Sequence, residues 1–391
     1  MSATSDAGLR RAVSPLELFF DLAFVFALRQ LAEHLHAELS WRGAAETAVM
    51  LVAVLSTWVL TSFDATFLDI TRPRTQGLVL AVMGLGLFMN AQIPHAFAAR
   101  PWAFTVPLVA ILLLTGATAA LTTSVAVLRS HYHRVLVWAA VSIPLWLAGA
   151  AADPGSRLVW WAGAAAVDLA GTWLRHPLPG RVFPSRHFVF DAEHMVERIR
   201  LFLILQLGET VLTIGSAISD APVDVPTTAA AFGVFVALVC LWATYFLGGE
   251  KIVTRQIAIT ADPMRSIHRA VNGLYGTLTG LVIGAVGSEL VIGHATGPGN
   301  AQVGLLLCGG PILYLVAQAW WYYVTTGRAW VARLLACGAC AAVGVAARWL
   351  PPLVSVLILD VVLVVLVVVL TRVHRQVVEA LDAGGGDRRR G

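Results

Sequence analysis

Residues 353–372, LVSVLILDVVLVVLVVVLTR, decide the fold class of this chain. The run is almost entirely valine, leucine and isoleucine, and Asp360 and Arg372 are its only ionisable residues. A helix needs roughly 20 mostly apolar residues to cross the hydrocarbon core of a bilayer, and this run has that length. We therefore predict a transmembrane helix here.

The rest of the 391-residue chain has the same character, with 58% hydrophobic and only 13% charged residues. Such a composition cannot cover a water-exposed surface. Eleven further apolar segments precede residue 353, separated by clusters of Arg, Pro, Gly or Asp, and these are residues 15–35, 45–68, 77–95, 102–127, 134–151, 157–174, 190–218, 227–248, 268–293, 301–324 and 329–349. The sequence predicts an all-α, polytopic integral membrane protein with about twelve transmembrane helices, and it leaves no room for a soluble catalytic domain.

The basic residues predict the orientation of these helices. If the N-terminus is cytoplasmic and every segment crosses, 22 of the 27 basic residues fall on the inner side. Arg29 falls within the first helix, and the outer side keeps only Arg42, Arg100, Arg157 and Arg348. Because basic residues concentrate in cytoplasmic loops, we predict a multi-pass plasma membrane protein with both termini in the cytoplasm.

The two halves of the chain resemble each other. The run E-L-F-F-D-L at Glu17 is echoed by E-R-I-R-L-F at Glu197, and Trp58 is echoed by Trp242. Since six is even, two such copies would lie parallel in the membrane. The sequence thus divides into a first six-helix repeat, a cytoplasmic connector, a second six-helix repeat and a basic flexible tail, at residues 1–174, 175–190, 191–373 and 374–391.

Ionisable side chains inside the membrane cost several kcal/mol unless they are paired or hydrated, so each one is a candidate for function. Glu17 and Asp21 lie one helical turn apart on one face of the first helix. The candidates for a substrate or ion pathway are Glu17, Asp21, Arg29, Asp64, Asp168, His194, Glu197, Arg198, Glu209 and Glu289. The alternative is structural: the same acids could cap helices and pair with arginines to hold the bundle in register.

Aromatic residues gather at the predicted depth of Asp21 and Asp64. They are Phe20, Phe24, Trp58, Phe63 and Trp242. Aromatic rings beside a carboxylic acid would stabilise carbocations, as a terpene-cyclase-like enzyme requires, with Asp21 or Asp64 as the general acid. No nucleotide, flavin or zinc motif accompanies them, so the sequence predicts no cofactor and no metal.

Several motifs resemble the bacterial low temperature requirement protein A family. They are S-P-L-E-L-F-F-D-L-A-F-V-F-A from Ser14, the E-R-x-x-L-F stretch ending in L-G-E-T at Thr210, W-x-x-Y-F from Trp242, and the A-V-G-x-E helix that ends at His294. The resemblance spans both halves and implies a bacterial inner-membrane protein. Leu247 and Tyr275 depart from it, because the family commonly has an acid and a histidine there.

A second resemblance is shorter. Phe20-Asp21 is similar to the F-S-D signature on the first helix of potassium channels built from two six-helix repeats.

Two functions of different classes follow from these residues. The first is transport, by an ion channel or a proton- or cation-coupled transporter, because Asp21, Asp64 and Asp168 lie toward the inner side and Arg29 and Glu209 toward the outer side. The second is an intramembrane enzyme acting on a lipid or isoprenoid. A structural or sensory role stays open. The expected partners are the lipid bilayer and a small ion or lipid-like molecule, not nucleic acid, and a homodimer is compatible with the sequence.

Overall fold

The computed structural model describes residues 12–68, 70–123, 125–179, 191–247, 262–327 and 329–387, and within them it is all helical, with no strand. The first half consists of α1 (Pro15–Ala37), α2 (Trp41–Phe67), α3 (Pro73–Asn90), the short 3-10 helix η1 (Ile93–His95), α4 (Pro101–Thr122), α5 (Ala126–Ala151) and α6 (Pro154–Leu174). The second half consists of α7 (Ala192–Asp220), α8 (Val225–Phe246), α10 (Pro263–Gly293), α11 (Ala301–Thr326), α12 (Trp330–Ala346) and α13 (Pro352–Asp387). Each apolar segment predicted from the sequence overlaps one of these helices.

Prolines and capping side chains fix where many helices begin. At the start of α1 the backbone N–H of Ser14 donates to Glu17 Oε2 (2.8 Å) and that of Glu17 donates to Ser14 Oγ (3.3 Å), forming a capping box. Proline in the first turn of α1, α3, α4, α6, α8 and α10 costs no hydrogen bond, because the first N–H groups of a helix have no partner within it. Aspartate side chains cap four helices, at Asp153, Asp191, Asp224 and Asp262.

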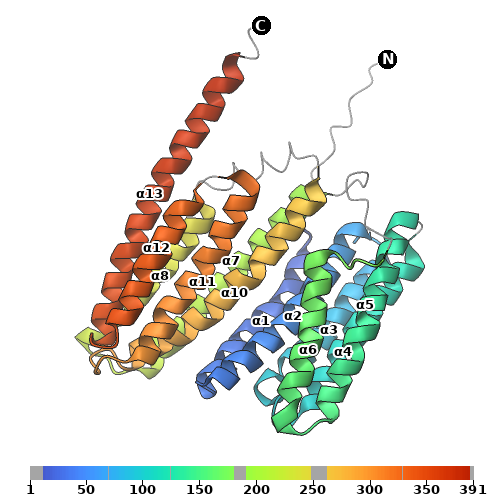
Figure 1. Cartoon of the computed structure of the whole chain (residues 1–391), viewed down its shortest axis with the longest axis horizontal. Helices are drawn as coiled ribbons and strands as arrows, with labels where there is room; N and C mark the ends of the chain where they lie inside the picture. The colour runs from blue at the N-terminus through green and yellow to red at the C-terminus, as the bar shows by residue number, and fades with distance from the viewer. Residues whose placement is uncertain are drawn as a thin grey trace.

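The helices lie side by side and alternate in direction, so the chain enters α1 and leaves α13 at the same end of the array (Figure 1). We call this the proximal end and the opposite one the distal end. Helix α13 continues to Asp387, so most of the segment predicted as a flexible tail is helical. Much of the predicted connector, residues 180–190, lies outside the described residues, as do the basic residues Arg10, Arg11, Arg181, Arg186, Lys251, Arg255, Arg328 and Arg388–Arg390.

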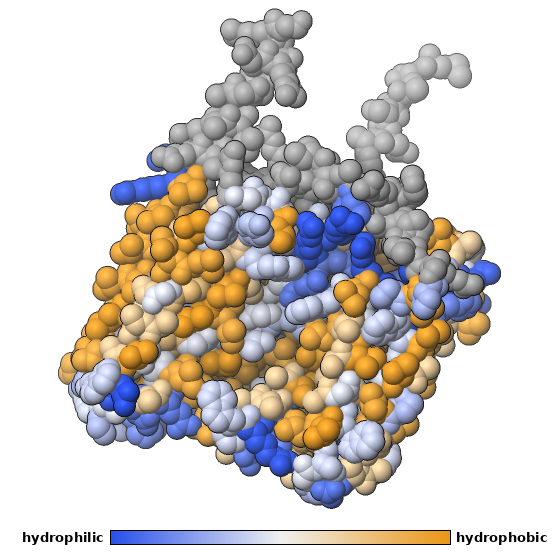
Figure 2. Space-filling view, in the orientation of Figure 1, coloured by the Kyte–Doolittle hydropathy of each residue, from blue (hydrophilic) through white to orange (hydrophobic). Residues whose placement is uncertain are grey.

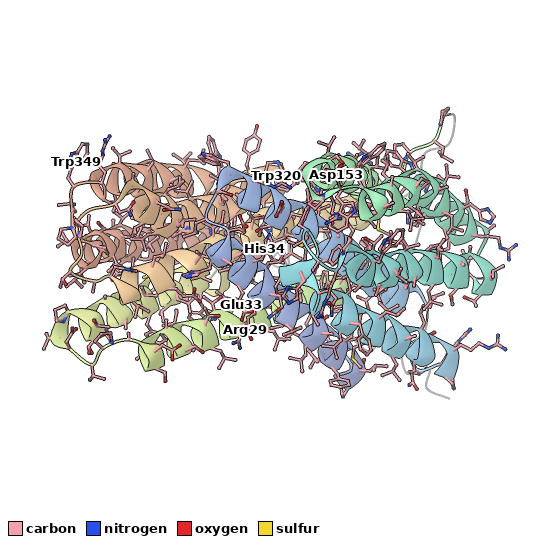
Figure 3. The ribbon with its side chains drawn as sticks, turned by 90° about the horizontal axis from the view of Figure 1, so that it is seen from below. Arg29, Glu33, His34, Asp153, Trp320 and Trp349 are labelled. Atoms are coloured by element: carbon pink, nitrogen blue, oxygen red, sulfur yellow. The ribbon has the colours of Figure 1, made fainter. Side chains whose placement is uncertain are left out.

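The outside of the array suits a bilayer. Eight helices, α2, α4, α5, α7, α8, α10, α11 and α13, are long and apolar enough to cross a membrane. Figure 2 shows a broad apolar surface between more polar ends. Large apolar side chains such as Phe88 and Leu335 are exposed. Trp41 and Trp349 are exposed at the distal end, and Trp349 is labelled in Figure 3. Tryptophan is favoured at a membrane–water boundary. The chain is therefore a multi-pass membrane protein.

The two halves repeat one packing scheme. In the first half α1 packs on α2 and α3, each later helix packs on its neighbour, and α2 packs on α6. In the second half α7 packs on α8 and α10, the neighbours pack in the same order, and α8 packs on α13. The halves meet where α1 contacts α7 and α10, and α10 also contacts α2 and α6. Figure 1 shows this contact between the blue-to-green group and the yellow-to-red group.

Candidate functional site

Four ionisable residues meet at the proximal end of the contact between α1 and α7. We call Glu17, Asp21, His194 and Arg198 the proximal ion cluster. Arg198 Nη2 lies 3.0 Å from Asp21 Oδ1, its Nη1 lies 3.7 Å from Glu17 Oε1, and His194 Nε2 lies 3.1 Å from the same Glu17 oxygen. All four side chains are buried. The sequence placed Glu17 and Asp21 on one helical face, and the structure brings that face against α7.

Aromatic rings surround the proximal ion cluster. Trp58 Nε1 donates to Asp21 Oδ1 at 2.8 Å, and the Trp58 ring stacks on Phe202 with centroids 4.3 Å apart. The Arg198 guanidinium lies 5.9 Å from the Phe20 ring centre and 5.8 Å from that of Trp58. Asp21 Oδ2 and Arg198 Nε are buried without a hydrogen-bond partner among the described residues. Such atoms are costly in a folded protein and mark places where a bound ion or water would be stabilised.

A second group of charges lies on the same contact toward the distal end. We call Arg29, Glu33, His36, Glu209 and Glu289 the distal ion cluster. Arg29 Nε lies 2.9 Å from Glu33 Oε1, Arg29 Nη1 lies 3.9 Å from Glu209 Oε1, and His36 Nδ1 lies 3.0 Å from Glu289 Oε2. The cluster joins α1 to α7 and α10, and its side chains are partly exposed. Figure 3, which looks at the distal end, shows Arg29 and Glu33 on α1.

A cavity of about 260 Å³, a volume that includes its open mouth, lies beside the distal ion cluster. Arg29 and Glu209 line it together with Gln206, Thr210 and Thr213. The side chain of Gln206 is buried and its Nε2 donates to the carbonyl of Phe24 at 3.5 Å, while its Oε1 has no hydrogen-bond partner among the described residues. Closer to the proximal ion cluster the contact is apolar, with Phe24, Leu28 and Phe202 buried. The contact therefore has polar groups at three levels: the proximal ion cluster, the buried Gln206 and the distal ion cluster. The apolar barrier of Phe24, Leu28 and Phe202 lies next to the proximal ion cluster.

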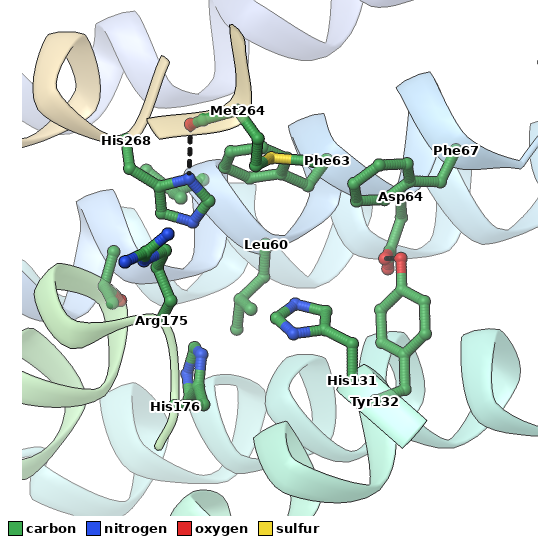
Figure 4. Close-up of a pocket in the computed structure, with 12 residues that line it drawn as sticks. Leu60, Phe63, Asp64, Phe67, His131, Tyr132, Arg175, His176, Met264 and His268 are labelled. Carbon is green, nitrogen blue, oxygen red and sulfur yellow. Dashed lines mark hydrogen bonds between the residues drawn. The ribbon is translucent and has the colours of Figure 1, made fainter. Parts of the chain in front are cut away.

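Asp64 and Asp168 lie elsewhere, inside the first half. Tyr132 Oη on α5 donates to Asp64 Oδ1 at 2.5 Å, and Trp146 Nε1 donates to Asp168 Oδ2 at 2.8 Å. Asp64 lines a cavity of about 510 Å³, a volume that includes its open mouth, between α2, α5, α10 and the end of α6 (Figure 4). Neither acid is part of the α1–α7 contact.

The remaining sequence candidates are spread over the molecule. Glu197, next to Arg198, is exposed. Phe63 lines the Asp64 cavity. Trp242 is 36% exposed and stacks on Phe246, so it does not join the aromatic residues around Asp21. Tyr275 stands where the family resemblance implied a histidine. Its Oη lies 3.3 Å from Ser56 Oγ and links α10 to α2 across the two halves.

Arg333 was not among the residues singled out from the sequence, where it counted only as one of the basic residues of the inner side. On α12 this side chain is fully buried, with Nε donating to Gln318 Oε1 at 3.1 Å and Nη2 donating to the carbonyl of Thr244 at 3.1 Å. Its guanidinium lies 3.9 Å from the Tyr322 ring centre. The apolar residues on both sides of Arg333 were the signal that it belonged to a helix interior.

Three histidines of the Asp64 cavity were also missed. His131, His176 and His268 come from segments far apart in the sequence, and only the fold brings them together. They do not form a metal site: among the described residues no group of three His, Cys, Asp or Glu side chains could hold a metal ion. The four cysteines are buried and free.

Comparison with known proteins places the chain in a family. Residues 12–368 match the family described as bacterial low temperature requirement A protein (LtrA). The chain is 31% identical over 312 residues to an uncharacterized protein of Rhizobium meliloti (strain 1021), covering 78% of this chain and 75% of that protein. No solved structure matches the chain. The match covers both ion clusters and the Asp64 cavity, and the protein belongs to the bacterial low temperature requirement A family.

Proposed function

We propose that the protein is a membrane transport protein, an ion channel or a proton- or cation-coupled transporter, with its route along the contact of α1 with α7 and α10. The observation that carries the proposal is the position of the two ion clusters. Residues that lie almost 180 positions apart in the sequence pair across this one contact, at the proximal end and again toward the distal end. A route across a membrane requires polar groups at several depths.

The proposed route is closed in this conformation. Glu17 and Asp21 both pair with Arg198 in a buried cluster, and Phe24, Leu28 and Phe202 fill the contact beyond it. An ion would therefore pass only after α1 moves against α7, which opens the apolar barrier and separates Asp21 from Arg198. Two discrete arrangements of packed helices are what alternating access or gating needs.

Flux measurements test the proposal. The purified full chain is reconstituted in liposomes, potassium and proton gradients are imposed, and ion flux is recorded for the wild type, Asp21→Asn and Glu209→Gln. We expect flux from the wild type and its loss in both variants. Asp220→Asn is the matched control, since it removes an exposed acid near the distal end of the same helix α7. Sealed, protein-containing vesicles without flux of either ion would refute the proposal.

The proposal includes twelve membrane crossings arranged as two parallel six-helix repeats. Its support is the shared packing scheme, in which α1 to α6 and α7 to α13 contact one another in the same order. Helices α1, α3, α6 and α12 are the four additional crossings. Both termini would then lie in the cytoplasm, on the proximal side.

An intramembrane enzyme is the second candidate, and the Asp64 cavity favours it. This cavity combines an acid, Asp64, with the apolar side chains of Leu60, Phe63 and Phe67, as a general acid acting on an isoprenoid or lipid would require. Asp64 suits this role better than Asp21, which is enclosed by Trp58 and Arg198. Incubation with polyprenyl substrates should yield a product with the wild type and none with Asp64→Asn. Absence of any product from the wild type would exclude this candidate for those substrates.

A further inference from the structure

The Asp64 cavity has two chemically different sides. Figure 4 shows Arg175, His176 and His268 on one side and Asp64 with Tyr132 on the other. The cavity lies at the proximal end of the array, where α2 and α6 end and α5 and α10 begin. The cavity shares no residue with the two ion clusters and lies outside the proposed transport route.

The basic side holds one permanent charge. Arg175, the residue that ends α6, forms no ion pair with a carboxylate among the described residues. Burial, together with the nearby His268 and Arg134 side chains, lowers the pKa of His176 to about 3, so its imidazole is neutral. An anion bound here would gain a charge-assisted hydrogen bond from the Arg175 guanidinium and would face the one ring N–H of neutral His176, whereas the Nδ1–H of His268 already donates to the carbonyl of Met264 at 2.9 Å.

The backbone is strained where it presents these two side chains. Arg175 and His176 have φ angles of +66° and +51°, in the left-handed region that costs a non-glycine residue roughly 1–2 kcal/mol. The turn is held by the N–H of His176 donating to the carbonyl of Gly171 at 2.7 Å, and by Trp138 Nε1 donating to the carbonyl of Pro177 at 3.0 Å. Strain of this kind accumulates at binding sites, where it fixes side chains in one direction.

The walls between the two sides are apolar. Val59, Leu60, Phe63, Phe67 and Met264 line the space of about 510 Å³, which includes the mouth. A small hydrated anion would lose water against these walls without replacing its hydrogen bonds. An alkyl or prenyl chain would be stabilised there, by about 0.8 kcal/mol for each buried methylene group.

We propose that this cavity binds a single-chain amphiphile whose anionic head group, a carboxylate or a phosphate, lies at Arg175 and His176 and whose chain lies against Leu60, Phe63 and Phe67. The ligand would enter at the membrane boundary, because the cavity lies where the helices end. The two head groups share the same chemistry at the guanidinium, and the experiment separates them.

The test measures equilibrium binding of radiolabelled dodecyl phosphate and of radiolabelled dodecanoate. The full chain is placed in phosphatidylcholine nanodiscs, and empty nanodiscs give the background. We expect saturable binding of one molecule per chain for at least one of the two probes, and whichever binds tighter identifies the head group. Dodecanol, dodecyltrimethylammonium and inorganic phosphate should each compete at least tenfold more weakly, because each lacks either the negative charge or the chain.

Variants assign the binding to this cavity. Arg175→Gln removes the charge and should weaken binding at least about tenfold, in line with one lost charge-assisted hydrogen bond. Leu60→Phe fills the apolar part and should weaken it as well, and this variant keeps the test valid if Arg175→Gln does not fold. Arg74→Gln, an exposed arginine at the same end, is the matched control.

Equal binding of dodecanol, full competition by inorganic phosphate, or unchanged binding in both cavity variants would overturn the proposal. Asp21→Asn should bind normally, which separates this result from any failure of the flux experiment.

Discussion

At the scale of single residues, Arg198 is the centre of the α1–α7 contact. Two carboxylates approach one guanidinium in a buried setting, and Trp58 shares Asp21 Oδ1 with it. Burying such charges is expensive, and their mutual attraction only offsets that cost while all partners are present. The cluster therefore fixes the register of the two halves, whatever else it does.

We predict that Arg198→Met destabilises the protein by about 3–5 kcal/mol, because it leaves Glu17 and Asp21 buried without their cation. Combining it with Asp21→Asn should restore part of the loss, giving a coupling energy of about 0.5–3 kcal/mol. Unfolding midpoints in detergent, followed by tryptophan fluorescence, measure both. Exposed Glu197→Gln should stay within about 0.5 kcal/mol of the wild type. Additive effects of the two changes would show that Asp21 and Arg198 are not paired.

At the scale of elements, α10 is the helix that joins the two halves, and its glycines determine how closely α11 approaches it. A Cβ atom on Gly280 would lie 2.6 Å from the carbonyl oxygen of Gly310 and 2.7 Å from the amide nitrogen of Tyr314. Both are backbone atoms, which cannot move aside without shifting the helix. Gly276, Gly280 and Gly284 recur every four residues in the sequence, a spacing that predicts a small-residue seam on one helix face, and the first two pack closely on α11.

We predict that Gly280→Ala destabilises the protein by about 1–3 kcal/mol through overpacking. Gly338→Ala on α12 is the control, because no atom lies within 4 Å of its would-be Cβ. There the substitution should be neutral or stabilising by about 0.5–1 kcal/mol, since glycine weakens a helix interior. The readout is the thermal unfolding midpoint of both variants. Equal effects at the two positions would contradict the close α10–α11 approach.

The start of α6 allows a test of pH dependence outside the membrane-spanning segments. The Ser156 hydroxyl, which donates to Asp153 Oδ2, and the backbone N–H groups of Ser156 and Gly155, which donate to Asp153 Oδ1, lower the pKa of this carboxyl below its usual 3.8. A depressed folded-state pKa contributes stability above the unfolded-state value, and that contribution is lost as the pH falls through the folded-state value.

We predict that Asp153→Asn is less stable than the wild type at pH 7 and that this difference shrinks as the pH falls below about 4 toward the lower folded-state pKa of Asp153. Unfolding midpoints of both proteins, compared from pH 7 to pH 3, measure it. A difference that grows on acidification would mean that the cap does not stabilise the ionised carboxyl.

At the scale of the whole molecule, the polar contact between two apolar half-bundles is the main feature. The buried apolar core is continuous across both halves, with Trp146 and Trp161 in the first and Tyr314 and Leu359 in the second. The charges of both ion clusters lie between the halves, not within them. A contact rich in paired charges can separate and re-form more readily than an apolar core, which suits relative movement of the halves.

We predict that loops at the two ends of the array lie on opposite sides of the membrane. Single cysteines at Ala152 and Ala221, at the distal end, should react with a membrane-impermeant thiol reagent in intact cells. Cysteines at Thr71 and Pro177, at the proximal end, should react only after the membrane is opened. The native cysteines are buried, so they should contribute little background. Labelling of a proximal and a distal position from the same side would refute the arrangement of twelve crossings.

Much of this architecture is determined by the sequence alone. Long apolar runs leave the backbone no way to satisfy its N–H and C=O groups in lipid except as helices, so segments such as residues 353–372 fix the helical class and nearly fix the helix positions. The spacing of Glu17 and Asp21 placed both on one face because a helical turn has a fixed length. The same local rules found the glycine seam of α10.

Only the tertiary structure decided which of the buried charges meet. Asp21 and Asp64 are equivalent by predicted depth, yet Asp21 pairs with Arg198 on α7 and Asp64 bonds to Tyr132 on α5. Arg175, His176 and His268 line one cavity although His268 lies about 90 positions after the other two in the sequence. Helical periodicity gives the direction of a side chain from its own helix, but which neighbour it faces depends on how the helices pack, and that is a property of the whole assembly.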